Sequence, residues 1–209
     1  MKFARIFKPS IQLIKNKGLL LPKETNLPTL SRSEIYDICD QLFATASPRQ
    51  QKYFHELLKR DGIQESRLRT IACMMKKEIF INFEGNINDV FKIGHEVTHL
   101  DYFTDEEVVP MTTERVFANM LNNLGIHTGN YPDYHMVSQC SNEEHPDYPS
   151  CYTLGSLASI PIAQIIDSGL IQLDDIKNLS RSNMQDMFMQ WGLDFKNTNE
   201  IIAEHINGL

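Results

Sequence analysis

The clearest element pair in the hydrophobic pattern of the chain is a strand followed by a buried helix. Residues 77–83 alternate between polar and apolar side chains, which is typical of a half-buried strand. After a turn, Asn86 or Asn88 offers a helix N-cap, and Asp89 suits the positive end of the helix dipole. The helix that follows has a wide apolar face. This face comprises Val90, Phe91, Ile93, Gly94, Val97, Leu100 and Phe103.

Helices predominate in the rest of the pattern. Ser31 and Glu34 form a capping box, and Ser47 followed by Pro48 is a second start signal. Residues 105–107 are interpreted as a solvated turn. We therefore expect a mainly α fold with a small β element. The predicted helices cover residues 31–44, 48–61, 64–75, 110–124, 152–167, 181–191 and 198–207.

Length and charge narrow the class of protein. The 209 residues suit a single domain covering 1–209, and a net charge of −7 argues against general nucleic-acid binding. No apolar run is long enough to span a bilayer, so we expect a soluble protein with no transmembrane segment. Residues 1–22 are basic and make a poor signal peptide. They are expected to pack on the domain as an arm or, alternatively, to contact a membrane or a partner as an amphipathic helix.

The four cysteines show no Cys-x-x-Cys spacing, so we expect them to remain thiols in a reducing compartment. They are Cys39, Cys73, Cys140 and Cys151. A disulfide between Cys140 and Cys151, or a contribution of this pair to metal binding, stays open as an alternative.

The buried helix carries His95-Glu96-Val97-Thr98-His99, an H-E-x-x-H motif. Positions i and i+4 lie on one face of a helix, so His95 and His99 can bind one metal ion. Glu96 can then act as a general base on a water molecule, as in zinc peptidases. The alternative is that both histidines are hydrogen-bonded core residues without a metal.

A catalytic zinc ion usually has a third protein ligand, and the downstream sequence offers carboxylates rather than a histidine at short spacing. Glu114 is favoured because it is a charge inside an apolar helical stripe, and a buried carboxylate needs a partner. The alternative is a half-exposed Glu114 paired with Arg115 or with a lysine. The full set of candidates is Asp101, Asp105, Glu106, Glu107 and Glu114.

The polar segment 127–149 is long for a loop inside one domain, and such loops are usually functional. If it crosses the metal cleft, His145 and Tyr148 lie over the scissile bond. Together with Tyr152, they are candidates to donate a hydrogen bond to the developing oxyanion. A structural loop rich in tyrosine is the alternative. Asp101, Asn119 and Asn122 are candidates to orient the two histidines.

Residues 79–99, IFINFEGNINDVFKIGHEVTH, resemble the core of the M3 peptidase family, the oligoendopeptidase F and thimet oligopeptidase group. In that family a similar strand leads directly into the zinc helix. The Glu114 helix resembles the family's glutamate-bearing helix, and residues 186–195 resemble its closing helix. The cluster of His145, Tyr148 and Tyr152 is similar to the one that faces the substrate carbonyl. The resemblance covers residues 70–195 and implies a zincin-like (gluzincin) metallopeptidase core with one Zn²⁺ per chain.

The sequence also departs from this family. Thr98 stands where the family normally has glycine, and Ser156 where it has a tyrosine. The stretch 99–114 is shorter than usual, and the family's large N-terminal helical part has no counterpart here. These departures indicate an open site that acts on a peptide or a folded protein. Short H-E-x-x-H chains also resemble bacterial effector proteases, which implies a location in the bacterial cytoplasm or the host cytosol and a host protein such as actin as substrate.

The predicted function is therefore that of a zinc-dependent endopeptidase. His95, His99 and Glu114 hold the metal ion, and Glu96 moves the proton from the attacking water to the leaving amine. The alternative is a catalytically inactive binding module that keeps an M3-like shell and docks a partner protein.

Overall fold

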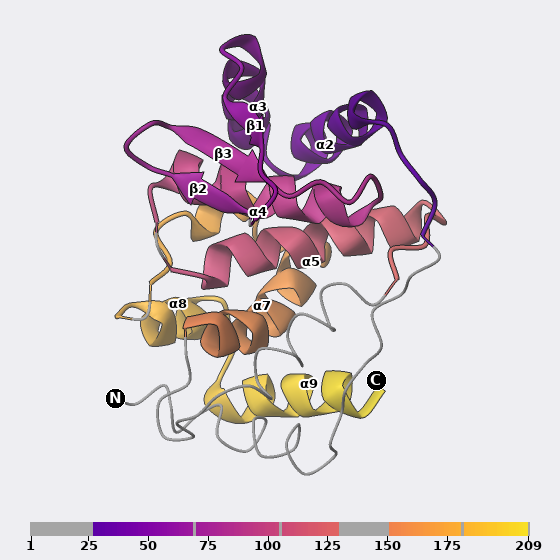
Figure 1. Cartoon of the computed structure of the whole chain (residues 1–209). Helices are drawn as coiled ribbons and strands as arrows, with labels where there is room; N and C mark the ends of the chain where they lie inside the picture. Colours follow the sequence, from indigo (N-terminus) through magenta and orange to yellow (C-terminus); the bar gives the residue numbers. More distant parts are fainter. Residues whose placement is uncertain (1–26, 69, 105, 130–150, 181, 209) are drawn as a thin grey trace.

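The computed structural model describes residues 27–68, 70–104, 106–129, 151–180 and 182–208. Within these ranges the chain is mainly helical with one small sheet (Figure 1), as the sequence predicts. The helices, labelled as in the figure, are α2 (Arg32–Ala46), α3 (Pro48–Lys59), α4 (Asn88–Tyr102), α5 (Val108–Asn123), α7 (Cys151–Asp167), the short 3-10 helix η1 (Leu173–Ile176), α8 (Met184–Gln190) and α9 (Phe195–Gly208). The strands are β1 (Ile63–Glu65), β2 (Ile71–Cys73) and β3 (Glu78–Ile81).

Helix start signals account for α2 and α3. The Ser31 hydroxyl accepts the N–H of Glu34, and the Glu34 carboxylate accepts the N–H of Ser31 at 2.7 Å. The Ser47 hydroxyl accepts the N–H of Gln50 at 3.1 Å, and Pro48 occupies the first turn of α3. Both predicted starts are confirmed. Helices α5, α7, α8 and α9 also overlap the segments predicted to be helical.

The sheet has the order β1-β3-β2, with β1 parallel and β2 antiparallel to β3. In β3, Ile79 and Ile81 are buried while their neighbours are partly exposed, which confirms the predicted half-buried strand. The predicted helix at 64–75 is wrong, because β1 ends and β2 lies within this segment. β2 forms a hairpin with β3 across the turn 74–77, and β1 pairs with β3 in parallel. Strands of three residues are too short to show a clear two-residue period.

The N-cap position of α4 is Ile87, so the expected N-cap at Asn86 or Asn88 is wrong. The Asn86 side chain nevertheless accepts the N–H of Asn88, the first residue of the helix, at 2.9 Å. The buried carboxylate of Asp89 accepts the backbone N–H groups of Glu84 and Gly85 at 2.9 and 2.7 Å. These hydrogen bonds fold the preceding turn onto the first turn of the helix. They also satisfy a charge that would be costly to bury alone.

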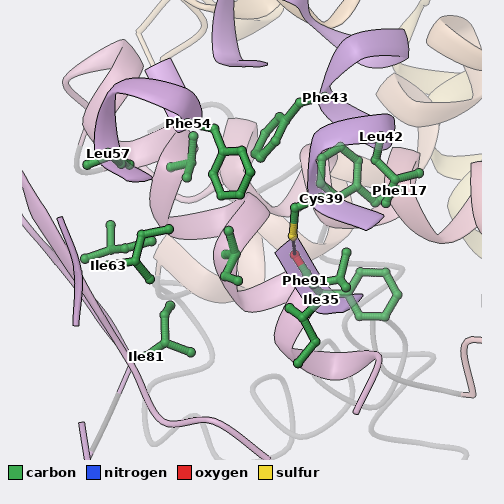
Figure 2. Close-up of a cluster of buried hydrophobic side chains, with 14 of the residues drawn as sticks. Ile35, Cys39, Leu42, Phe43, Phe54, Leu57, Ile63, Ile81, Phe91 and Phe117 are labelled. Atoms are coloured by element: carbon green, nitrogen blue, oxygen red, sulfur yellow. Dashed lines mark hydrogen bonds between the residues drawn. The ribbon is translucent and has the colours of Figure 1, made fainter. Parts of the chain in front are cut away.

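In Figure 1, α4 lies between the sheet and α5, with α2 and α3 above them and α7, α8 and α9 below. Figure 2 shows the core around α2, α3 and α4, where the ring of Phe43 packs against Phe54 and Phe117 at centroid distances of 5.4 and 5.0 Å. Most of α4 is buried, as its wide apolar face predicts. Helix α4, which carries the H-E-x-x-H motif, is therefore held in place by packing on several sides.

A second core lies on the other side of α5 and joins it to α7, η1, α8 and α9. The end of α4 is tied to this layer through Asp174 in η1. The Tyr102 hydroxyl donates to the Asp174 carboxylate at 2.8 Å, and the Ser47 hydroxyl donates to the same oxygen at 2.5 Å. One half-buried carboxylate thus links η1 to the ends of two helices.

Some expectations fall on residues that the structure does not describe. These are the basic arm 1–22, nearly all of the segment 127–149, Cys140 and the side chain of Cys151. Cys39 and Cys73 are free thiols, as expected. Among the helices of the described ranges, none combines the length and the apolar character needed to cross a membrane.

Replacing Ser47 with alanine is expected to destabilise the fold more than replacing Ser31 with alanine. Losing an N-cap costs about 0.5–2 kcal/mol at either position. Buried Ser47 also donates to Asp174, which adds about 0.5–1.5 kcal/mol. The measurement is the free energy of unfolding in urea for each single variant. Equal losses would show that the hydrogen bond to Asp174 does not contribute.

Candidate metal centre

The H-E-x-x-H motif lies on α4, and all three of its functional side chains are buried. The helical spacing brings His95 and His99 together, with their Nε2 atoms 3.0 Å apart and their ring centroids 4.8 Å apart. The predicted meeting of the two imidazoles is therefore found in the structure. What remains is the origin of a third donor.

The third donor at this position is Glu107. Helix α4 ends at Tyr102, where the C-cap residue Phe103 has a left-handed φ of 52°, and α5 begins at Val108. Glu107 therefore occupies the N-cap position of α5, but its carboxylate makes no capping hydrogen bond. Its Oε2 instead lies 3.1 Å from Nε2 of His95 and 3.6 Å from Nε2 of His99.

The burial of Glu107 corrects the interpretation of 105–107 as a solvated turn. Its exposed fraction is 5%, and its Oε2 has no hydrogen-bond partner in the described part of the chain. A buried carboxylate oxygen of this kind is costly unless a cation neutralises it. The sequence signal was available but weak, because an acid directly before the apolar start of a helix is more often exposed.

Both imidazole rings are oriented by partners on their other nitrogen. The Nδ1 of His99 donates to the backbone carbonyl of Thr104 at 2.7 Å. The Nδ1 of His95 lies 2.7 Å from Oε1 of Glu114. A neutral imidazole carries one N–H, so these contacts leave both Nε2 atoms as lone-pair acceptors. Together with Oε2 of Glu107, three acceptor atoms then face one point with no donor among them.

The structure thus gives the two glutamates different places. Glu114 is buried, as the apolar stripe around it predicted, but it contacts Nδ1 of His95, which points away from the shared centre. Glu107 contacts the Nε2 side. A carboxylate on Nδ1 cannot share an ion held by Nε2 of the same ring. The geometry therefore favours Glu107 over Glu114 as the third ligand and makes Glu114 the residue that orients His95.

The electrostatics of the centre show the same need for a cation. Burial opposes a charge on His95, but its contacts with Glu107 and Glu114 outweigh burial and hold its pKa well above the ordinary value. Burial would also raise the pKa of Glu107, yet its contacts with His95 and His99 hold that pKa well below the ordinary value. In the absence of a metal ion, a proton on His95 offsets the charge of Glu107.

The distances between the donors fit a zinc ion. Zn–N and Zn–O bonds of about 2.0–2.1 Å in tetrahedral geometry separate neighbouring donors by roughly 3.3 Å. The three observed separations are 3.0, 3.1 and 3.6 Å. Within the described ranges, His95, His99 and Glu107 form the group of side chains with metal-ligand geometry.

Glu96 lies beside this centre, as the motif predicts. Burial raises the pKa of its carboxyl, and the nearby His95 and His99 offset part of that rise. The carboxylate also accepts the backbone N–H of Ala72. This contact places β2, an edge strand of the described sheet, next to Glu96.

Helix α7 approaches the third donor through a glycine. A Cβ atom built on Gly155 would lie 2.8 Å from both the backbone carbon and the Cβ of Glu107. Any other residue would therefore force α7 or Glu107 to move. Tyr152 precedes Gly155 by one helical turn, which puts its backbone on the same side of α7. The side chains of Tyr152, Tyr148 and His145 lie outside the described part of the structure.

Two of the departures from the M3 pattern, Thr98 and Ser156, are buried side chains in the core. The Thr98 hydroxyl accepts Nε2–H of Gln50 at 2.9 Å and lies 3.1 Å from the hydroxyl of Thr113. The buried Ser156 hydroxyl lies 3.1 Å from Sδ of Met111. Both residues therefore connect packed helices. The structure shows neither of them in contact with the metal donors.

The residues proposed from sequence proximity to orient the histidines have other partners. Asp101 forms an ion pair at 3.2 Å, and Asn119 and Asn122 form hydrogen bonds at 2.5 and 3.3 Å. The backbone carbonyl of Thr104 takes the orienting role for His99, and a carbonyl leaves no signal in a sequence. The partners of the three residues are Arg49, Asp167 and Thr128, in that order.

Comparison with known proteins adds no assignment: no family model, no curated protein and no solved structure matches the chain. The resemblance to M3 peptidases therefore rests on the sequence segments that suggested it.

Glu107→Ala is expected to lower zinc affinity by more than roughly 10²-fold, because it removes a donor. Glu114→Gln should cost less, about 10- to 100-fold, as is typical when an orienting partner is lost. Glu106→Ala is the matched control and should change little. Zinc titration against a competing chelator measures all three variants. A larger loss in Glu114→Gln than in Glu107→Ala would restore Glu114 as the ligand.

Gly155→Ala is expected to lower metal affinity by displacing Glu107. Overpacking costs about 1–3 kcal/mol, and if half of that cost falls on the position of Glu107, zinc affinity drops by up to roughly tenfold. Ser156→Ala is the control, since it alters the same buried stretch of α7 without adding bulk at Glu107. Zinc affinity and unfolding free energy are measured for both. Equal zinc affinity in the two variants would contradict the steric link.

Proposed function

We propose that this protein is a zinc-dependent endopeptidase with His95, His99 and Glu107 as metal ligands and Glu96 as general base. The observation that carries the proposal is that two imidazole nitrogens and one carboxylate oxygen, all buried, converge on one point. The carboxylate of Glu96 lies beside them. Two imidazoles and one carboxylate are a ligand set typical of catalytic zinc in peptidases, with one coordination position left open.

A bound zinc ion supplies Lewis-acid activation of a water molecule and of the substrate carbonyl. The chain's own residues carry the proton. Glu96 accepts a proton from the water molecule while the oxygen of that water attacks the carbonyl carbon of the substrate. It then delivers that proton to the amine nitrogen as the C–N bond breaks. A buried carboxyl with a raised pKa is suited to this task, because a base with a pKa nearer neutrality both accepts and returns a proton efficiently.

The developing oxyanion needs a donor from the protein as well. Tyr152 is the favoured candidate, because α7 holds its backbone one turn before the contact between Gly155 and Glu107. His145 and Tyr148 remain candidates from the sequence. A hydrogen-bond donor aimed at the oxyanion acts most strongly in a site that excludes water.

The proposed substrate is a peptide or protein segment in extended conformation. Strand β2 is an edge of the sheet, and the N–H of Ala72 points to Glu96 rather than to a neighbouring strand. An edge strand offers backbone groups that can align a peptide beside the reacting centre. The role of a bacterial effector that cleaves a host protein such as actin rests on the sequence resemblance alone.

Glu96→Gln is expected to keep the metal and lose cleavage. Glutamine preserves the size of the side chain and its acceptor for Ala72, but it cannot take a proton, so the rate should fall by roughly 10²- to 10⁴-fold. The test compares wild-type and variant protein on a cell lysate, with zinc content measured in parallel. A variant that cleaves at the wild-type rate removes Glu96 from the mechanism. If neither form cleaves any protein while both bind zinc, the chain is a binding module.

A further inference from the structure

Residues 66–77 differ in charge from the rest of the chain. They contain Arg67, Arg69, Lys76 and Lys77 and no aspartate or glutamate, in a protein of net charge −7. The side chains of Arg67, Lys76 and Lys77 are exposed. Arg67 lies in the loop before β2, and Lys76 and Lys77 lie in the turn after it, so cationic side chains flank both ends of this strand. Such side chains attract anionic groups.

The same segment exposes large apolar side chains. Among the described residues, Met75 and Leu68 are the most exposed large hydrophobic side chains, at 96% and 91%. Ile71 is also exposed, and it pairs with the partly exposed Phe80 of β3. Leu68 directly follows Arg67, and Met75 directly precedes Lys76, so each end of β2 carries an exposed apolar side chain next to a cationic one. This combination is typical of a contact surface rather than of a solvated face.

This surface adjoins the proposed catalytic base. Strand β2 lies in the middle of the 66–77 segment, and the N–H of Ala72 donates to the Glu96 carboxylate. Side chains alternate between the two faces of a strand, so Ile71 and Cys73 lie on the face opposite to Ala72. A peptide aligned along β2 therefore meets the apolar and basic side chains of the segment while its backbone lies near Glu96.

We infer that residues 66–68 and 70–77 form a substrate-binding surface that selects protein segments carrying acidic residues next to apolar ones. This inference rests on the proposed function and adds the chemical class of the substrate. A membrane is the weaker occupant, because an anionic bilayer would repel the acidic remainder of the protein. A segment of a protein substrate contacts only the basic surface and avoids that repulsion.

Binding is tested on zinc-loaded Glu96→Gln protein with two short fluorescent peptides, one alternating leucine with glutamate and one alternating leucine with glutamine. Exposed ion pairs contribute about 0.2–1 kcal/mol each. Two such pairs should make the glutamate peptide bind roughly 2- to 30-fold more tightly at low salt. The preference should shrink as salt screens the charges.

Matched charge reversals locate the effect. The double variant Arg67→Glu/Lys76→Glu should lose or invert the preference. The control Lys52→Glu/Lys177→Glu changes the net charge equally at two exposed lysines outside the segment and should keep it. Equal binding of the two peptides, no measurable binding of either, or the same loss in the control overturns the inference. Binding to phosphatidylserine vesicles that falls only in the first variant, with no peptide preference, also overturns it in favour of a membrane.

The outcome is separable from that of the proposed function, because the peptide preference is measured without turnover. A preference for the glutamate peptide that depends on Arg67 and Lys76 supports the surface even if the wild-type protein cleaves nothing. Cleavage that depends on Glu96 but shows no charge preference upholds the peptidase and overturns the substrate class.

Discussion

The structure depends on one unfavourable contact: the lone pairs of three buried side chains, His95, His99 and Glu107, face each other where α4 leads into α5. The carbonyl of Thr104 and the carboxylate of Glu114 fix the outer nitrogens of the two imidazoles, so both inner nitrogens point at Glu107. Such an arrangement is stable only with a cation at its centre, whether proton or metal. The rest of the fold holds these groups together despite that cost.

Packing from two sides supplies this restraint. The sheet, α2 and α3 bury one side of α4. Helix α5 covers the other side, and α7 packs against α5. Polar contacts add direction to the apolar packing. Thr98 links α4 to both Gln50 and Thr113, and Asp89 fixes the turn that feeds α4. Movement of either helix would break these buried hydrogen bonds as well as the apolar packing.

Local signals in the sequence predicted the elements that depend on neighbouring residues. The capping pairs begin α2 and α3, and the i, i+4 spacing brings His95 to His99. The third donor was harder, because the place of Glu107 follows from the left-handed C-cap at Phe103 and from the start of α5. Glu114 was correctly singled out as a buried charge, but its sequence position could not say which ring nitrogen it contacts. The strands at 63–65 and 71–73 escaped prediction because three residues are too few to show the two-residue period of a strand.

All three donors lie between residues 95 and 107, on one helical hairpin. The loop that must close to assemble them is short, so the entropic cost of bringing them together is small. During synthesis the hairpin leaves the ribosome before α7, α8 and α9 do, which lets the donors meet while the second core is still unmade. Gly155 is synthesised later, and α7 then packs against Glu107 through this glycine. The order of the chain thus separates the assembly of the donors from the step that makes their geometry rigid.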